Sequence, residues 1–172
     1  PDNERGPLMF DNLKKKLGIA GAERVVVSPV AGQAVPLSEV SDPTFSEEIL
    51  GKGAAVIPSE GKIVSPVDGI IDLMFETGHA VSMRSNDGAE VLIHVGLDTV
   101  KLAGKHYTVH HKNGDKVRAG ELLITFDLDA IKAEGYDPIT LVIICNTEEF
   151  SSVHPHTGTT VAALDTLLTL KK

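Results

Sequence analysis

Hydrophobic and polar positions alternate at short intervals along most of this chain. Alternating or continuous apolar runs of strand length occur at 82–85 (SMRS), 90–95 (EVLIHV), 122–126 (LLITF) and 138–145 (PITLVIIC). Turn-forming pieces such as NDG and NGD separate these runs. Period-two alternation between tight turns is typical of antiparallel strands. The pattern predicts an all-β fold.

Spacing typical of helices is sparse. The stretch 42–50 (DPTFSEEIL) predicts one short helix, with Asp42 as its N-cap and Pro43 in its first turn. The stretch 127–135 (DLDAIKAEG) predicts a second, ended by Gly135. Two short helices therefore accompany the strands.

One strand-turn-strand pattern occurs twice. The segments VVSPVAGQAV at 26–35 and IVSPVDGIID at 63–72 share Ser-Pro-Val-x-Gly, and Ser28 and Ser65 are 37 positions apart. A solenoid needs more copies than two, so the repeat indicates a duplicated motif within one core. The sequence predicts a pseudo-symmetric, antiparallel β-sandwich over residues 24–172.

The first 23 residues differ from the rest and are expected to form a flexible leader. Within them, 8–19 (LMFDNLKKKLGI) is a candidate amphipathic helix that could make weak contact with a membrane surface. A solvated leader is the favoured alternative, because twelve residues rarely hold a helix alone. The leader is excluded from the predicted domain.

Composition and charge narrow the class of protein. The net charge of −8 and the lack of a basic stripe with interleaved aromatics exclude a nucleic-acid binder. No apolar run is long enough to cross a bilayer, and no signal peptide is recognisable. The single cysteine, Cys145, lies in an apolar run and is expected to pack as a small hydrophobe. We expect a protein of the reducing cytoplasm.

Candidate chemistry begins with His94, an imidazole inside the apolar run VLIHV. Residues 78–96 predict a hairpin, and its turn decides where His79 lies. A turn at Asn86-Asp87 places His79 directly opposite His94, and a turn at Asp87-Gly88 makes the two rings diagonal neighbours. A three-residue loop would put them on opposite faces.

Strand alternation assigns faces to this hairpin. One strand is expected to present Phe75, Thr77, His79 and Val81 together, and the next Leu92, His94 and Gly96, while Val91, Ile93 and Val95 enter the core. Two neighbouring imidazoles resist holding two protons, which keeps one neutral and nucleophilic. A pair that only packs and hydrogen-bonds is an equally weighted alternative.

The motifs VLIHVGLDTV and FETGHAV resemble those of the glucose-type enzyme IIA family of the bacterial phosphoenolpyruvate-dependent sugar phosphotransferase system. VSPVAG, SDPTFSEEILGKG, SPVDG and GDKVRAGELLITFDL extend the resemblance over residues 25–172. The resemblance implies a duplicated β-sandwich that carries phosphoryl groups. The donor would be the phosphohistidine of the carrier HPr, and the acceptor a cysteine of the enzyme IIB domain of a sugar permease.

The resemblance also implies residue roles. His94 is similar to the phosphorylated residue, attacking through Nε2, and His79 to the auxiliary histidine that steadies phosphoryl oxygens. Thr77 would orient His79, and the carbonyl of Gly96 would accept the Nδ1 proton of His94. No metal or other cofactor is expected.

Partner contacts follow from the same resemblance. The apolar rim where HPr and enzyme IIB would dock matches Phe45, Ile49, Leu50, Phe75, Val81, Leu92 and Val100, with Asp98 among them. This chain differs from some members of the family in having Gly78, Val81 and Leu92 at these positions. Unphosphorylated protein is expected to regulate permeases or metabolic enzymes, as part of the family does. The leader resembles that of free-standing members, and the sugar is not readable from this chain.

Two other classes compete with this interpretation. A zinc hydrolase of the LytM type needs three protein ligands, and His154 and His156 would have to join His79 and His94. A biotin or lipoyl carrier is suggested by GDKVRAGELL, but no lysine with the required flanking signature is evident. The remaining histidines, His106, His110 and His111, are expected to be solvated loop residues.

Overall fold

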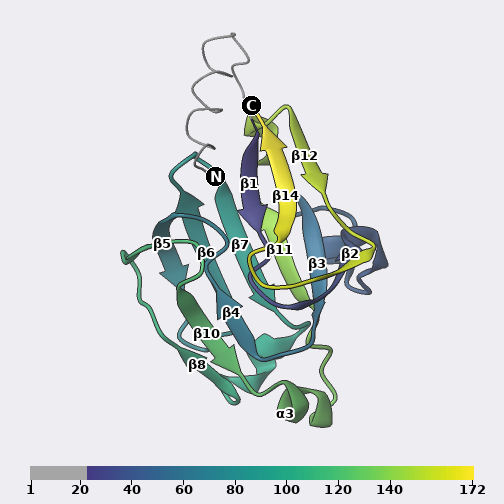
Figure 1. Cartoon of the computed structure of the whole chain (residues 1–172). Helices are drawn as coiled ribbons and strands as arrows, with labels where there is room; N and C mark the ends of the chain where they lie inside the picture. Colours follow the sequence, from purple (N-terminus) through teal and green to yellow (C-terminus); the bar gives the residue numbers. More distant parts are fainter. Residues whose placement is uncertain (1–22) are drawn as a thin grey trace.

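The computed structural model describes residues 23–172, so the candidate helix at 8–19 lies outside the described residues. Their strands form one eight-stranded sheet, in the order β13-β2-β3-β11-β7-β6-β5-β9, and two three-stranded sheets, β1-β14-β12 and β4-β10-β8 (Figure 1). All the strand pairs are antiparallel. The predicted all-β class is confirmed. The bounds are β1 Arg24–Val27, β2 Gly32–Pro36, β3 Lys52–Pro58, β4 Lys62–Val64, β5 Gly69–Met74, β6 Ala80–Ser85, β7 Glu90–Val95, β8 Tyr107–Val109, β9 Lys116–Val117, β10 Leu122–Phe126, β11 Thr140–Ile144, β12 Ser152–Pro155, β13 Thr159–Val161 and β14 Thr166–Lys171.

The duplicated motif folds the same way in both copies. The buried hydroxyl of Ser28 donates to the carbonyl of Val30 at 2.7 Å, and that of Ser65 donates to Val67 at 2.6 Å. The order of the eight-stranded sheet also places β2 and β5, β3 and β6, and β11 and β7 at matching positions from its two ends. The predicted pseudo-symmetry is confirmed.

The two copies are joined reciprocally. The amide of Val27 donates to the carbonyl of Pro66 at 3.1 Å, and the amide of Val64 donates to the carbonyl of Pro29 at 2.8 Å. Each donor and acceptor in one bond has its repeat equivalent in the other bond. This exchange is what a local two-fold axis between the copies requires.

The duplication extends further than the sequence repeat shows. Leu164 donates its amide to Ser28 at 2.9 Å, as Gly120 does to Ser65 at 2.8 Å. Both residues have left-handed backbones, with φ of +78° and +98°. Their different side chains conceal the equivalence in the sequence.

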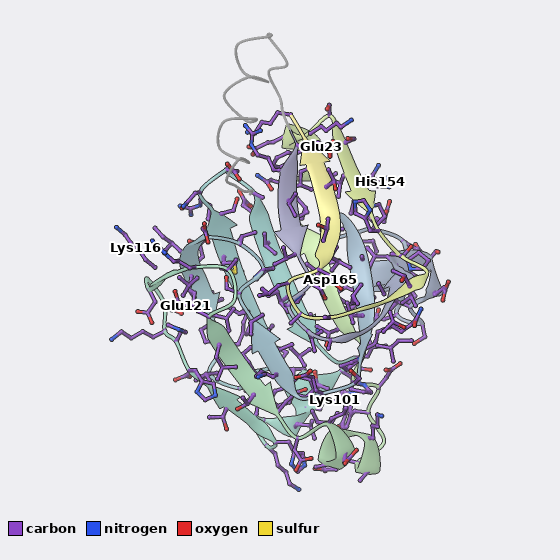
Figure 2. All side chains as sticks on the ribbon, in the orientation of Figure 1. Glu23, Lys101, Lys116, Glu121, His154 and Asp165 are labelled. Atoms are coloured by element: carbon purple, nitrogen blue, oxygen red, sulfur yellow. The ribbon has the colours of Figure 1, made fainter. Side chains whose placement is uncertain are left out.

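Matching carboxylates complete these two turns. Glu121 accepts a hydrogen bond from the amide of Arg118 at 2.7 Å, and Asp165 accepts one from the amide of Ala162 at 2.8 Å. Both carboxylates are labelled in Figure 2. A backbone amide in a turn has no partner within a strand and needs a hydrogen-bond acceptor. A carboxylate supplies that acceptor in both copies.

The main core lies between the eight-stranded sheet and the two smaller sheets. It includes residues from all three sheets, among them Val26, Ile63, Ile93, Val142 and Leu168. A second core covers the opposite face of the eight-stranded sheet. Its members are Val35, Leu37, Val40, Phe45, Ala55, Leu97, Ile139, Leu141 and Ile143, with Leu92 packed against them. The eight-stranded sheet is therefore apolar on both faces near its centre.

The two expected helices are present but short. Asp42 caps α2 (Pro43–Ser46) by accepting from the amide of Thr44 at 3.0 Å. This helix stops before the predicted residue 50, because Glu48 enters the left-handed region at φ +58°. α3 (Leu128–Ala133) lies within the predicted stretch 127–135: Asp127 is its N-cap, and Gly135 follows its C-cap residue Glu134. Within residues 23–172, none of the helices is long and apolar enough to cross a membrane.

The expected burial of Cys145 is wrong. The residue follows the last position of β11 and its side chain is exposed. Partial desolvation, and then the charge of Glu90, raise the pKa of its thiol. The apolar run continues into β11, but it ends one residue before the cysteine.

Candidate functional site

His94 lies on β7, between Ala80 of β6 and Leu141 of β11. The buried side chains Val91, Ile93 and Val95 enter the main core, as predicted. The ring of His94 therefore faces the second core, where the ring of Phe45 lies 5.2 Å away, centre to centre. His94 is half-buried among apolar groups and is not fully open to solvent.

The hairpin has the third of the three registers that the sequence left open, the one with a three-residue loop. Ala80 pairs with His94, Arg84 pairs with Glu90, and the amide of Ser85 donates to the carbonyl of Ala89 at 2.8 Å. Three residues, 86–88, therefore form the loop. This was the alternative that strand alternation associated with opposite faces for the two histidines.

The two imidazoles nevertheless meet, because His79 lies outside β6. It follows Gly78, whose φ is +73°, in the turn that joins β5 to β6. The carbonyl of His79 accepts from the amide of Val95 at 2.7 Å, which ties the turn to β7. The ring centres of His79 and His94 are 5.2 Å apart, with planes at 80°. Strand alternation does not apply in this turn, so the rings share a site.

Gly78 is required by this turn. A Cβ atom at Gly78 would lie 2.8 Å from the Cβ of Tyr107, closer than real contacts allow. Its left-handed backbone also favours glycine. Gly78 therefore has a local structural role in this turn.

The predicted common face of Phe75, Thr77, His79 and Val81 is also wrong. β5 ends at Met74 and β6 begins at Ala80, so the first three residues lie in a turn. Val81 lies on β6 with no exposed surface and belongs to the main core. Phe75 remains beside His79, with ring centres 5.1 Å apart.

Each histidine is anchored through Nδ1. The Nδ1 of His94 lies 2.7 Å from the carbonyl oxygen of Gly96, and the Nδ1 of His79 lies 2.5 Å from the hydroxyl of Thr77. A carbonyl only accepts, so Nδ1–H of neutral His94 donates and its Nε2 keeps a lone pair. Both contacts were expected from the sequence and are present.

Burial keeps both rings neutral near pH 7. Desolvation, and then the positive charge that His94 can carry, lower the pKa of His79 to about 4. Desolvation also lowers the pKa of His94, while the Gly96 hydrogen bond and the charges of Asp42 and Asp98 act in the opposite direction. The like-charge effect expected from the sequence is present, but burial is the larger cause.

Sequence reasoning missed the residues that hold the Gly96 turn. The hydroxyls of Thr99 and Tyr107 donate to the carbonyl of Val95 at 2.7 and 2.8 Å. A Cβ atom at Gly96 would lie 2.4 Å from Thr99 Cγ2, so the turn needs glycine. Thr99 follows the histidine motif closely, but nothing in the sequence connects the distant Tyr107 to this carbonyl.

The predicted rim is only partly exposed. Ile49, Leu50 and Val100 are 67%, 39% and 54% exposed, and Asp98, two residues before Val100, is also exposed. Phe75 and Leu92 are half-buried. Phe45 and Val81 are buried, so their expected place on an open docking rim is wrong. Phe45 instead packs against the ring of His94.

The other histidines do not join this pair. His154 lies on β12 of a three-stranded sheet, and His156 directly follows that strand. His106, His110 and His111 contact Glu134, Thr125 and Asp115, so they are surface residues with side-chain partners. Among residues 23–172, no group of three or more His, Cys, Asp or Glu is placed to hold a metal ion.

Comparison with known proteins identifies the class. Residues 24–150 match the family described as phosphoenolpyruvate-dependent sugar phosphotransferase system, EIIA 1. The chain is 43% identical to a glucose-specific EIIA component of Oceanobacillus iheyensis, covering 84% of this chain and 88% of the relative. Glucose permease IIA from Mycoplasma capricolum has a similar structure, with a TM-score of 0.81 and 31% identity over 87% of this chain and 96% of that one.

The chain belongs to this EIIA family, and the expected phosphoryl-carrier class is confirmed. It is also 51% identical to a β-glucoside-specific EIIBCA component of Bacillus subtilis, over 76% of this chain. The match covers only 22% of that relative, and a similar one covers 25% of the EIIBCA component of Dickeya chrysanthemi. None of these comparisons supports the zinc hydrolase.

Proposed function

We propose that this protein accepts a phosphoryl group on Nε2 of His94 from the phosphohistidine of HPr and passes it to a cysteine of an enzyme IIB domain. The arrangement of His94 supports this most directly: its Nδ1 is bonded to Gly96 and a second imidazole lies beside it. Relatives named EIIBCA carry an EIIB and an EIIA component in one chain, which supports the acceptor.

The first step is an in-line displacement at phosphorus. The lone pair of His94 Nε2 forms a new N–P bond while the N–P bond of the donor histidine breaks. The bonding electrons stay on the donor imidazole. Because the pKa of His94 is lowered, the lone pair is available near pH 7. The Gly96 carbonyl keeps accepting from Nδ1–H and stabilises the positive charge that builds on the ring.

His79 supports the transfer without forming a bond to phosphorus. If the hydroxyl of Thr77 donates to Nδ1, the proton of neutral His79 is on Nε2 and can donate to a phosphoryl oxygen. With a pKa of about 4, His79 holds this neutral tautomer at physiological pH. Thr77 is thus a positioning residue for the donor.

The onward step transfers the phosphoryl group to sulfur. The cysteine thiolate forms an S–P bond as the bond to His94 Nε2 breaks. The charges of Asp42 and Asp98, which raise the pKa of His94, oppose the negative charge of a phosphoryl group on the same ring. This repulsion favours release to the acceptor.

No metal is needed in this scheme, because hydrogen-bond donors and positioning supply the stabilisation. The test uses purified phospho-HPr, separated from the magnesium of its preparation. Chelation with EDTA should leave transfer to His94 unchanged. A rate that falls in EDTA and recovers with added Mg²⁺ would contradict the metal-free scheme.

We expect HPr and enzyme IIB to dock in turn on the exposed residues Ile49, Leu50 and Val100. Ile49→Lys or Val100→Asp should weaken both partners and leave folding intact, because both side chains are more than half exposed. Val25→Lys is the matched control, since Val25 is 47% exposed on β1, which belongs to a different sheet from His94. Loss of one partner alone would reject a shared surface.

The deciding experiment is incubation with phosphoenolpyruvate, enzyme I and HPr. One histidine should be labelled, with an acid-labile and alkali-stable bond, and His94→Ala should remove the label. His110→Ala, at an exposed histidine outside the site, should keep it. Label that remains in His94→Ala would reject the assignment.

The protein works in the cytoplasm, where its carrier partners are expected. The unphosphorylated form binds regulated permeases or metabolic enzymes through the face around His94. The sugar is chosen by the permease that carries enzyme IIB, because the proposed chemistry at His94 involves no sugar.

A further inference from the structure

His154 and His156 bring a second pair of imidazoles together, on a different sheet from His94. β12 is an edge strand, on which His154 pairs with Thr169 of β14. The amide of His156 donates to Leu167 at 2.8 Å and continues the ladder. Residues two apart on a strand share one face. The two ring centres are 4.9 Å apart, with planes at 85°.

This separation fits two nitrogen ligands on one metal ion. Imidazole nitrogens bind zinc at about 2.0–2.1 Å, and the ring centre lies about 1.1 Å beyond the nitrogen. Ligand angles between square-planar and tetrahedral then place the two ring centres about 4.5–5.2 Å apart. The observed 4.9 Å lies within that interval.

The His156 ring, and the backbone of both residues, are held before any ion arrives. Pro155, between them, fixes its own φ and restricts His154 to extended conformations. Nε2 of His156 lies 2.7 Å from the hydroxyl of Thr169, which orients the ring and leaves Nδ1 for a ligand bond. His154 is exposed, so a hydrated ion can reach it (Figure 2). Binding of an ion would therefore cost little conformational entropy in the backbone and in the His156 ring.

We propose that His154 and His156 form a surface chelate for a divalent transition-metal ion, with water completing the coordination. Two neutral imidazoles suit Cu²⁺, Ni²⁺ and Zn²⁺, and the Irving–Williams order places Cu²⁺ first. The surface depression that contains His154 is also lined by Glu23 and Lys171. Their charges are opposite, so they offset one another near the ion.

This site is separate from the proposed phosphoryl-transfer chemistry. β12 belongs to a three-stranded sheet, whereas His94 belongs to the eight-stranded sheet. With two protein ligands, the ion would exchange readily and would not match a closed structural zinc site, which uses four. Metal binding at this pair is therefore tested independently of phosphorylation at His94.

Residue-resolved NMR of the whole chain, residues 1–172, tests the proposal. Substoichiometric Cu²⁺ should selectively broaden the amide signals of 153–157 and Thr169, and Zn²⁺ should shift the same signals. His154→Gln or His156→Gln should weaken Zn²⁺ binding at this position at least about tenfold, since even groups that only support a ligand contribute ten- to hundredfold. Thr169→Val should weaken it about tenfold or more by the same reasoning.

His110→Gln is the matched control. Its Nε2 lies 3.0 Å from the hydroxyl of Thr125, which resembles the bond of His156 to Thr169, but the only close imidazole pairs in residues 23–172 are His79–His94 and His154–His156. The control should bind Zn²⁺ at 154–156 as the parent does. Broadening confined to other histidines, or equal affinity in the parent and in His154→Gln, overturns the proposal. Signals near His94 report any binding at that pair separately.

Discussion

The two halves of the eight-stranded sheet have matching backbones and different chemistry. His94 lies between Ala80 and Leu141, whereas Ile143 occupies the equivalent place in the other half, between Gly53 and Leu92. Ile143 has no exposed surface and is a member of the second core. One duplicated position therefore became a hydrophobic contact and the other a half-buried imidazole.

The neighbouring turn differs in the same way. His79 lies opposite Val95 through a backbone hydrogen bond of 2.7 Å, and Lys52 lies opposite Ile144 at the equivalent place. One half therefore has two imidazoles where the other has an isoleucine and an exposed lysine. A few side chains and one turn therefore distinguish the candidate site from a purely structural copy.

The largest expected effect comes from replacing His79, the second imidazole, and it is an effect on the rate of phosphoryl transfer. His79→Gln keeps a side-chain donor, and we expect acceptance from HPr to continue while transfer to enzyme IIB slows by about 10²–10³. The onward step suffers more, because a cysteine acceptor brings fewer positive groups of its own than HPr. Single-turnover measurements of both half-reactions check this.

Lys52→Gln is the control at the equivalent position and should change neither half-reaction. Equal slowing of both steps in His79→Gln, or no slowing in either, would refute the division of roles. An effect of Lys52→Gln as large as that of His79→Gln would show that the two halves are not chemically distinct.

Acid should destabilise the half that carries the histidines. The folded pKa of His79 is about 4, below its ordinary value of 6.5, so the unfolded chain binds the proton first. Stability should therefore fall as pH drops from about 6.5 to 4, by about 3 kcal/mol from this group. Urea unfolding at several pH values measures it.

Carboxylates elsewhere in the protein also titrate in acid. The contribution of His79 is therefore the difference between the parent and His79→Gln in how the free energy of unfolding depends on pH. The free energy of unfolding of His79→Gln should depend less on pH in this window. Parallel curves for the two proteins would contradict a buried, neutral His79. Lys52→Gln should follow the parent curve.

Equivalent substitutions in the two Ser-Pro-Val-x-Gly motifs should lower the stability of the protein by equal amounts. Ser28→Ala and Ser65→Ala each remove a buried hydroxyl that donates to a carbonyl two residues on. Each change should lower the free energy of unfolding by about 1–3 kcal/mol, because a buried acceptor loses its partner. Denaturant titration checks both variants, and a difference above about 1 kcal/mol would break the predicted equivalence.

The smallest effects are expected at the turn where the halves use different residues. Gly120 and Leu164 have equivalent left-handed backbones. Gly120→Ala should destabilise by about 1 kcal/mol, because a Cβ atom disfavours this conformation. Leu164→Gly should stabilise slightly or be neutral, since Leu164 is 51% exposed and loses little burial. Thermal unfolding of both variants measures these shifts, and marked destabilisation by Leu164→Gly would contradict this interpretation.

Local patterns in the sequence predict the fold class, the duplicated motif and the identity of the paired histidines. Period-two alternation and the Ser-Pro-Val-x-Gly repeat are local patterns, and the serine hydroxyl of each repeat donates to a carbonyl two residues on. The anchors of His79 and His94 are also local, because Thr77 and Gly96 are each two residues away. Such short-range bonds depend little on the rest of the fold.

How those histidines meet, and which residues surround them, depends on contacts between segments that are distant in sequence. Sequence alternation holds only while a strand continues, and the three-residue loop at 86–88 shifted the register by one position. The turn that carries His79 restored the contact, supported by Tyr107 packing against Gly78. Burial of Phe45 and Val81 likewise depends on the second core and the main core, whose members are distant in sequence. Contacts between distant segments carry no local signature, so they appear only when the sheets are packed.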